Sequence, residues 1–290
     1  MMRICGFTFV RNALKYAYPV VESICSVLPV VDKMIVNVGY SEDGTLELIQ
    51  SIESDKIEII QSIWDESLRK NGQVLAVETN KAFDAIPPDY DWAFYIQADE
   101  VIHEKHYENI RQSLARWTDQ PQVEGLLFTY THFYGTYDYV GDSRNWYTHE
   151  IRIIRNNKKI RSYKDAQGFR IENRKLRVKP ADASIFHYGW VKTPEQMKEK
   201  LRYFNSLWHN QEWIDKKIPS DKVYDFSEFE SLSLFAGTHP AIMRNRIESL
   251  NCKVSFDSTQ RSMPLKDRLL YYFERITGYR LFEYKNYKQI

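Results

Sequence analysis

The stretch Trp92-Ala93-Phe94-Tyr95-Ile96, followed at once by Gln97-Ala98-Asp99-Glu100, joins an apolar run to two neighbouring carboxylates. Five apolar residues in succession predict a buried strand. Open α/β sheets bind their ligands at the carboxyl ends of strands, and carboxylate oxygens suit hard cations such as Mg²⁺ or Mn²⁺. We therefore expect a metal site at this strand end. The alternative interpretation is a polar turn in which Asp99 or Glu100 begins the next helix.

Strand and helix patterns alternate on both sides of this stretch. The predicted strands cover residues 3–9, 33–38, 57–60, 92–96 and 125–134. Apolar residues at helical spacing lie between them, so the order predicts an α/β fold with a mostly parallel sheet flanked by helices. Right-handed crossovers bring the loops after the first, second and fourth strands to one edge of that sheet. Residues 193–290 are predicted to form a helical C-terminal extension packed on residues 1–192.

The composition excludes several classes of protein. The net charge of +1 over 290 residues provides no general attraction for nucleic acid. The three cysteines, Cys5, Cys25 and Cys252, form no Cys-x-x-Cys pair, which argues against a disulfide framework or a zinc site. We find neither a signal peptide pattern nor a long apolar span. These features predict a cytoplasmic protein with at most peripheral contact at the inner face of a membrane, and they leave its oligomeric state open.

Four segments lie in an order that resembles the family 2 glycosyltransferases, which are inverting enzymes with the GT-A fold. They are Phe9-Val10-Arg11-Asn12, Ser41-Glu42-Asp43-Gly44-Thr45, Gln97-Ala98-Asp99-Glu100 and His187-Tyr188-Gly189-Trp190. In that family the first two segments contact the nucleotide, the third holds the metal and the donor diphosphate, and a later histidine completes the metal site. The resemblance covers residues 3–190 and makes residues 1–192 the expected nucleotide-sugar-binding and catalytic domain.

The resemblance implies a set of ligand-binding residues. Those expected at the nucleotide-sugar are Phe9, Arg11, Asn12, Asn37, Gly39, Ser41, Asp43, Asn80, Gln97, Ala98 and Asp99. Asp99 and His187 are the expected ligands of Mn²⁺ or Mg²⁺, and a UDP-sugar is the expected donor. The sequence departs from the family pattern twice, because Gln97 replaces the first metal-motif aspartate and Gly39 stands near the usual nucleotide-binding aspartate.

An inverting transfer needs a base on the acceptor side of the sugar carbon. Related enzymes carry an acidic residue between the sheet and the late histidine, so Asp165 is our first choice for the base and Glu150 is our second. The competing interpretation of both residues is an ordinary surface or turn carboxylate.

These features predict a metal-dependent inverting glycosyltransferase that moves a sugar to a glycan or glycolipid acceptor. A degenerate GT-A domain that binds a nucleotide-sugar or glycan without turnover is the first alternative, favoured by Gln97 and Gly39. A nucleotidyltransferase ranks last, because no glycine cluster follows the first strand. The aromatic and basic stretch 265–288 is expected to pack on the main domain, with membrane contact as the alternative.

Overall fold

The computed structural model describes residues 2–65, 67–68, 72–250 and 254–290, so Cys252 lies outside the described residues. The strands of the main sheet are β1 (Ile4–Val10), β2 (Lys33–Gly39), β3 (Ile57–Ser62), β4 (Trp92–Tyr95), β5 (Glu100–Ile102), β6 (Gly125–Tyr134), β7 (Tyr139–Gly141), β8 (His149–Arg155), β12 (Arg177–Trp190), β13 (Leu232–Leu234) and β14 (Lys288–Gln289). A small second sheet contains β9 (Ile160–Ser162), β10 (Phe169–Ile171) and β11 (Arg174–Lys175).

The helices lie mostly between the strands of the first half and again in the last third. They are α1 (Val20–Val27), α2 (Thr45–Gln50), α3 (Gln73–Asp84), α4 (Tyr107–Trp117), α5 (Pro194–Ser206), α6 (Gln211–Lys217), α7 (Arg244–Ser249) and α8 (Leu265–Thr277), with 3₁₀ turns η2 (Glu104–His106) and η3 (Ala241–Met243). No helix within the described ranges is both long and apolar enough to cross a membrane.

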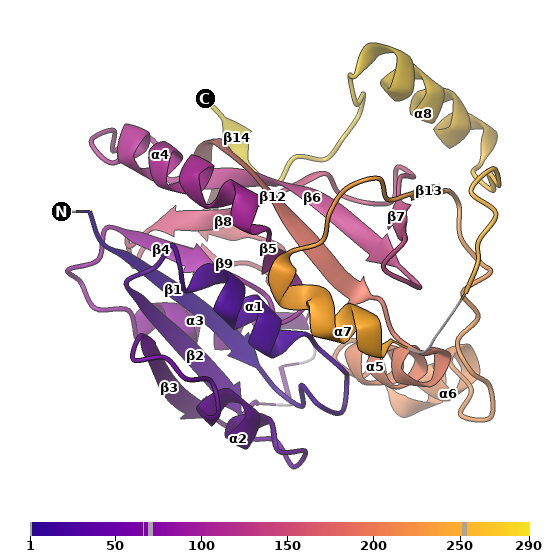
Figure 1. The fold of residues 1–290 in the computed structure, drawn as a ribbon, viewed down its shortest axis with the longest axis horizontal. Helices are drawn as coiled ribbons and strands as arrows, with labels where there is room; N and C mark the ends of the chain where they lie inside the picture. The colour runs from indigo at the N-terminus through magenta and orange to yellow at the C-terminus, as the bar shows by residue number, and fades with distance from the viewer. Residues whose placement is uncertain (1, 66, 69–71, 251–253) are drawn as a thin grey trace.

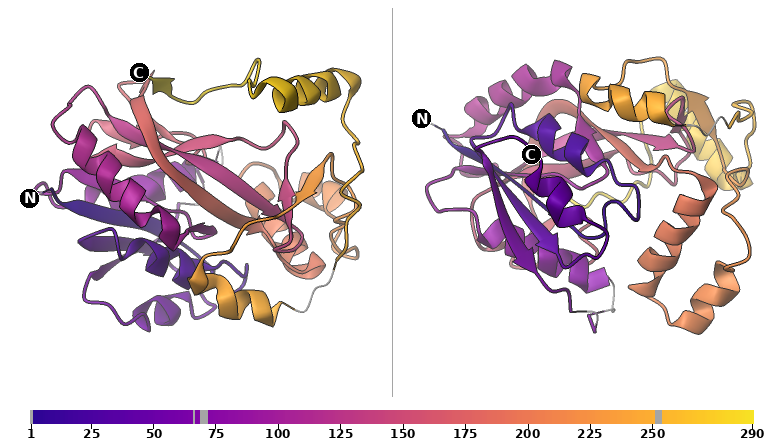
Figure 2. Two further views of the ribbon diagram at one scale, coloured as in Figure 1. Left: turned by 45° about the horizontal axis from the view of Figure 1, so that its top comes forward. Right: turned by 60° about the horizontal axis from the view of Figure 1, so that its bottom comes forward.

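The predicted α/β class is confirmed. The strands β3, β2, β1 and β4 lie side by side and all run parallel, and β8 joins them antiparallel between β4 and β6 (Figure 1). Along β1, Ile4 and Val10 face one core with α1 and α4, while Cys5 and Phe7 face a second core with α3. This two-residue alternation is what a strand covered on both faces requires, and Figure 2 shows the helices around the sheet.

Two parts of the middle of the chain differ from the sequence-based expectation. Glu100 does not begin a helix, because it is the first residue of β5, which pairs antiparallel with β12. The sequence pattern predicts only a short strand at residues 184–186, whereas the structure extends it to the 14-residue β12, which runs parallel to β6. The local sequence pattern does not indicate these strands in full, because they contain polar and charged residues. Glu100, for example, is buried only because it has a partner that lies far away in the sequence.

That partner is Arg152 on β8. Its Nη2 and Nε atoms donate to the two carboxylate oxygens of Glu100 over 2.7 and 2.8 Å, and both side chains are almost completely buried. Tyr130 O–H and the backbone N–H of Gln97 also donate to Glu100, over 2.8 and 3.1 Å. The pair is therefore fully hydrogen-bonded, which is the condition under which a buried ion pair is tolerated.

We predict that Glu100→Gln destabilises the fold by about 3 kcal/mol, because it leaves the buried Arg152 charge without its counter-ion. Urea unfolding monitored by tryptophan fluorescence measures this change. The matched control is Glu58→Gln, which removes the exposed partner of Lys33 and is expected to cost less than about 1 kcal/mol. Equal losses in the two variants would contradict the structural role given to Glu100.

Candidate active site

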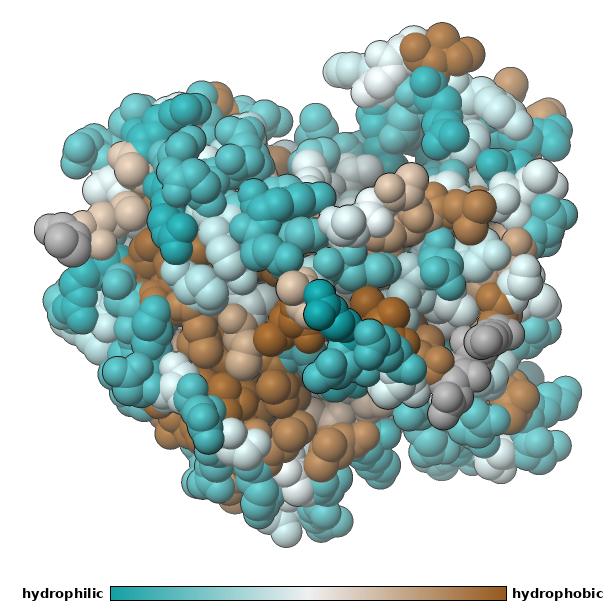
Figure 3. Space-filling model, viewed as in Figure 1, coloured by the Kyte–Doolittle hydropathy of each residue, from teal (hydrophilic) through white to brown (hydrophobic). Residues whose placement is uncertain are grey.

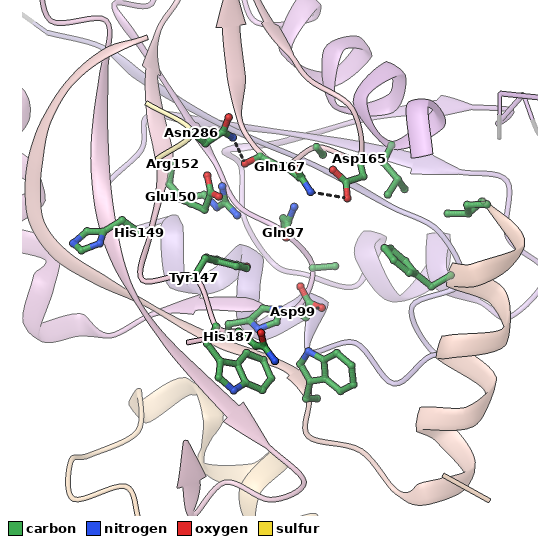
Figure 4. Close-up of a pocket in the computed structure, with 18 of the residues that line it drawn as sticks. Gln97, Asp99, Tyr147, His149, Glu150, Arg152, Asp165, Gln167, His187 and Asn286 are labelled. Atoms are coloured by element: carbon green, nitrogen blue, oxygen red, sulfur yellow. Dashed lines mark hydrogen bonds and ion pairs between the residues drawn. The ribbon is translucent and has the colours of Figure 1, made fainter. Parts of the chain in front are cut away.

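A cavity of about 630 Å³ opens at the carboxyl ends of β1 and β4. Its wall combines the loop after β4, strands β8 and β12, the loop before β10, helix α5 and the C-terminal segment (Figure 4). The predicted site residues that line it are Phe9, Arg11, Gln97, Ala98, Asp99, Glu150, Asp165 and His187. The structure thus brings the expected metal ligands and both candidate bases into one cavity, at the sheet edge that the topology indicated.

Asp99 and His187 face each other in this cavity. The Oδ2 atom of Asp99 lies 3.6 Å from Nε2 of His187. The backbone holds them in place, because Tyr188 N–H donates to the carbonyl of Asp99 over 2.8 Å where β12 passes the loop. Both side chains are largely buried, so their relative positions are fixed by the sheet.

The histidine orientation is set by a chain of hydrogen bonds. His187 Nδ1 lies 3.0 Å from Nδ1 of His132, and Nε2 of His132 lies 2.8 Å from the carbonyl of Tyr147. Burial, reinforced by the nearby His187, lowers the pKa of His132 to about 3, so this imidazole is neutral. Its proton must sit on Nε2 to donate to the carbonyl, so Nδ1 accepts from His187. In the neutral form of His187 the ring proton is then on Nδ1, so the Nε2 lone pair is available to a cation placed between this ring and Asp99.

A lysine that sequence reasoning missed lies next to Asp99. Lys200 on α5 lies with Nζ 3.2 Å from Asp99 Oδ2 and donates to the carbonyl of Gly189 over 2.8 Å. Burial alone raises the pKa of Asp99, but the positive charge of Lys200 and the neighbouring His187 ring outweigh it and hold that pKa well below its usual value. Asp99 is therefore ionised at all physiological pH values.

The geometry of Asp99 and His187 fits a divalent cation. Two ligands 3.6 Å apart can both reach one ion at about 2.1 Å, and a carboxylate with an imidazole suits Mn²⁺ better than Mg²⁺. Within the described ranges no group of three or more His, Cys, Asp or Glu side chains encloses a metal site.

Glu150 is an unusual carboxyl group in the same cavity. Burial raises its pKa to about 8, against the opposing effect of Arg152. Within the part of the chain that the structure describes, its Oε2 atom is buried and has no hydrogen-bond partner. A carboxyl group with this pKa is mostly protonated at neutral pH and acts as a hydrogen-bond donor there.

Asp165 also presents a buried carboxylate atom without a described hydrogen-bond partner, Oδ1, while its Oδ2 accepts from Gln167 over 3.3 Å. Burial raises its pKa, and hydrogen bonds from neighbouring groups oppose that effect. Asn286 of the C-terminal segment donates to the carbonyl of Gln167 over 2.9 Å and so supports this loop from behind (Figure 4).

The missing aspartate near Gly39 has a structural explanation. Any Cβ at Gly39 would overlap the indole of Trp64, which packs against Phe9 with ring centroids 5.7 Å apart. Trp64 lines the cavity, and among the described residues its indole N–H is buried without a hydrogen-bond acceptor. The guanidinium of Arg11 lies 5.5 Å from the same ring. Phe9 and Trp64 thus form an aromatic wall of two tilted rings, with the Arg11 guanidinium beside it.

The other predicted nucleotide contacts have structural partners outside the cavity lining. Ser41 Oγ accepts from the N–H of Asn12 over 2.9 Å, and Asp43 accepts from the N–H of Thr45 over 3.1 Å at the start of α2. Asn37 on β2 donates from its amide to Glu78 of α3 over 2.8 Å, and Asn80, within α3, accepts through Oδ1 from the N–H of Ser162 over 2.9 Å. Their assignment to the nucleotide stays a prediction.

Three site residues carry no signal that sequence reasoning can use. Lys200 lies in a helix of alternating charges, Trp64 follows a strand in a short loop, and His132 is a polar residue inside a long strand. His132 becomes visible only through strand register, because it lies directly beside His187 in the β6–β12 pair.

No protein-family model matches the chain, and no curated protein matches its sequence. Among solved structures it is similar to S. aureus TarS, with 16% identity and a TM-score of 0.40 over 70% of this chain and 39% of that one. Glucosyl-3-phosphoglycerate synthase from Mycobacterium tuberculosis has 17% identity and a TM-score of 0.30, covering 45% of this chain and 43% of that one.

A third similar structure has a different activity in its name. The 4-diphosphocytidyl-2C-methyl-D-erythritol synthase from Anaerococcus prevotii has 12% identity and a TM-score of 0.32, over 94% of this chain and 96% of that one. The chain spans about two fifths of the length of that TarS chain. At these scores the likenesses carry no argument about activity, so the chemistry must be argued from the site itself.

We predict that folding stability falls as the pH rises from about 5 to about 8, in part because of Glu150. Its folded pKa of about 8 lies above the usual 4.5, so the folded state binds the extra proton in this window and loses that advantage as the proton leaves. Melting temperatures measured across this range should therefore decline less in Glu150→Gln than in the natural protein. Parallel declines in the two proteins would contradict the raised pKa.

Proposed function

We propose that this protein is a metal-dependent inverting glycosyltransferase of the GT-A type, related to family 2, which moves a sugar from a UDP-sugar to a hydroxyl of a glycan or glycolipid. One observation carries the proposal: Asp99 and His187, distant in sequence, place a carboxylate oxygen and an imidazole nitrogen 3.6 Å apart in a cavity that also contains buried carboxyl groups.

The cavity has the parts that a nucleoside diphosphate requires. Phe9 and Trp64 offer aromatic faces for a base. Asp99 and His187 would hold a divalent cation, which supplies charge neutralisation to the departing diphosphate. Lys200, already beside Asp99, adds a positive charge for the same leaving group.

The transfer itself is a single displacement at the anomeric carbon. The acceptor oxygen forms its bond to that carbon as the bond from the carbon to the diphosphate oxygen breaks, so the configuration inverts. The acceptor proton passes to Asp165, which lines the cavity and has a buried carboxylate oxygen without a partner among the described residues. Glu150, protonated at neutral pH, holds a sugar or acceptor oxygen through a donated hydrogen bond.

Binding without turnover is the second candidate function. It is favoured by the neutral Gln97 in the metal motif and by the ion pair between Asp99 and Lys200, which a cation must displace in order to bind. A transferase and a binding protein would both bind the nucleotide, but only the transferase would form product.

We predict that UDP with Mn²⁺ raises the melting temperature of the natural protein and that Asp99→Asn or His187→Ala removes the Mn²⁺-dependent part of this rise. A ligand at about 100 times its Kd adds about 2.7 kcal/mol of stability, which thermal-shift measurements detect. Asp165→Asn is the control, since it lies off the diphosphate and is expected to keep the full shift. A Mn²⁺-dependent shift that survives in Asp99→Asn would refute the metal assignment.

Measurements of turnover distinguish the role of Asp165 from that of Glu150. We predict that Asp165→Asn lowers kcat by about 10²–10⁴-fold, the range typical of a lost general base, with UDP affinity unchanged. Glu150→Gln keeps a neutral donor at the same position and is expected to retain most activity at neutral pH. Release of UDP from a panel of UDP-sugars with glycan acceptors measures both. The opposite ranking would identify Glu150 as the base, and UDP affinity with no release in any combination would favour the binding function.

A further inference from the structure

Helix α8 carries its apolar side chains on the side that faces solvent. They recur at helical spacing and are 65%, 65%, 50%, 40% and 84% exposed at Leu265, Leu269, Tyr272, Phe273 and Ile276, which we call the α8 apolar face. We expected the stretch 265–288 to pack on the main domain; polar contacts and β14 attach it there, while this apolar stripe lies exposed. Figures 1 and 2 show α8 at the edge of the molecule, and Figure 3 shows apolar residues on the surface that α8 forms.

Specific polar contacts hold the helix in this orientation. Tyr271, the one buried residue of α8, donates from its hydroxyl to Asp142 over 2.9 Å. Glu274 accepts from Arg144 over 2.7 Å on the same inner side. A second cavity of about 420 Å³ lies beneath the helix, between these contacts and the β6–β7 region. The helix is therefore attached through its polar side, and its apolar side is left for another surface.

Around the α8 apolar face the basic side chains are more exposed than the acidic ones. Lys266, Arg268 and Arg275 are exposed, whereas the acidic Asp267 and Glu274 are less exposed and Glu274 is paired with arginines of the body. The outer side of the helix thus combines an apolar stripe with a cationic border. This combination is complementary to an anionic lipid surface, where apolar side chains enter the acyl boundary and Lys or Arg meet the headgroups.

The same surface continues to the mouth of the active-site cavity. Phe282 and Tyr284, which follow α8 in the chain, are 86% and 73% exposed, and both line that cavity. Arg280 lines both the active-site cavity and the cavity beneath α8. A surface that covered α8 would consequently lie next to the cavity mouth.

We propose that the α8 apolar face, together with Phe282 and Tyr284, docks on an anionic membrane surface and places the cavity mouth at headgroup level. The acceptor is then an amphiphile whose hydroxyl headgroup enters the cavity while its lipid tail stays in the bilayer. The identity of the acceptor rests on the proposed function, whereas the docking itself does not.

Co-sedimentation of the full chain with lipid vesicles tests the docking. We expect binding to vesicles of phosphatidylcholine and phosphatidylglycerol in equal parts, and much weaker binding to phosphatidylcholine alone. The double variant Leu269→Glu with Ile276→Glu should bind the anionic vesicles at least about tenfold more weakly, because two apolar anchors are replaced by charges of the lipid's own sign. Lys266→Glu with Arg268→Glu should also weaken binding and reduce its salt dependence.

The matched control is Ile63→Glu, which makes the same chemical change at an isoleucine that is 83% exposed, outside α8 and the C-terminal segment. It should bind vesicles like the natural protein. Absence of vesicle binding, an equal loss in Ile63→Glu, or self-association that the α8 double variant abolishes without any vesicle binding would overturn the proposal. The UDP thermal shift of the same samples reports the proposed function separately, so failure of one does not imply failure of the other.

Discussion

The buried ion pair between Glu100 and Arg152 is the constraint on which the site depends. Glu100 accepts from the backbone N–H of Gln97 and thereby closes the turn that carries Asp99. The strand that Glu100 begins pairs with β12, so the turn is fixed between β4 and the strand that carries His187. Two charges without water are costly to hold, and here the cost is offset by complete hydrogen bonding. The position of Asp99 in the cavity therefore follows from the ion pair between Glu100 and Arg152.

Much of the fold could be predicted from the sequence, because the first half consists of buried strands and amphipathic helices with regular spacing. The expected strand at 125–134 matches β6 residue for residue, and the expected run at 33–38 lies within β2. The middle of the chain could not be predicted in the same way. Strands such as β5 and β12 contain charged or polar residues whose partners are more than fifty residues away, and local pattern does not record such pairs.

The residues of the candidate site also fall into two groups, those that the sequence predicts and those that only tertiary packing brings together. A resemblance in short segments was enough to expect Asp99 and His187 in one place, since both follow or lie in strands that meet at one sheet edge. Lys200 and Trp64 were not expected, because their roles arise from tertiary packing: one reaches in from α5, and the other occupies space that Gly39 leaves. The raised pKa of Glu150 likewise results from burial, which a sequence does not display.

The end of the chain links two regions that are otherwise separate. After α8 the backbone returns to the sheet, where β14 pairs with the start of β12, and on the way Asn286 bonds to the loop that carries Asp165. The segment is therefore anchored at both ends, like a strap across the molecule. The strap thus joins the contacts of α8 to the loop that carries Asp165 in the wall of the cavity. By thermodynamic reciprocity, whatever factor a contact at the strap applies to nucleotide affinity, the nucleotide applies equally to that contact.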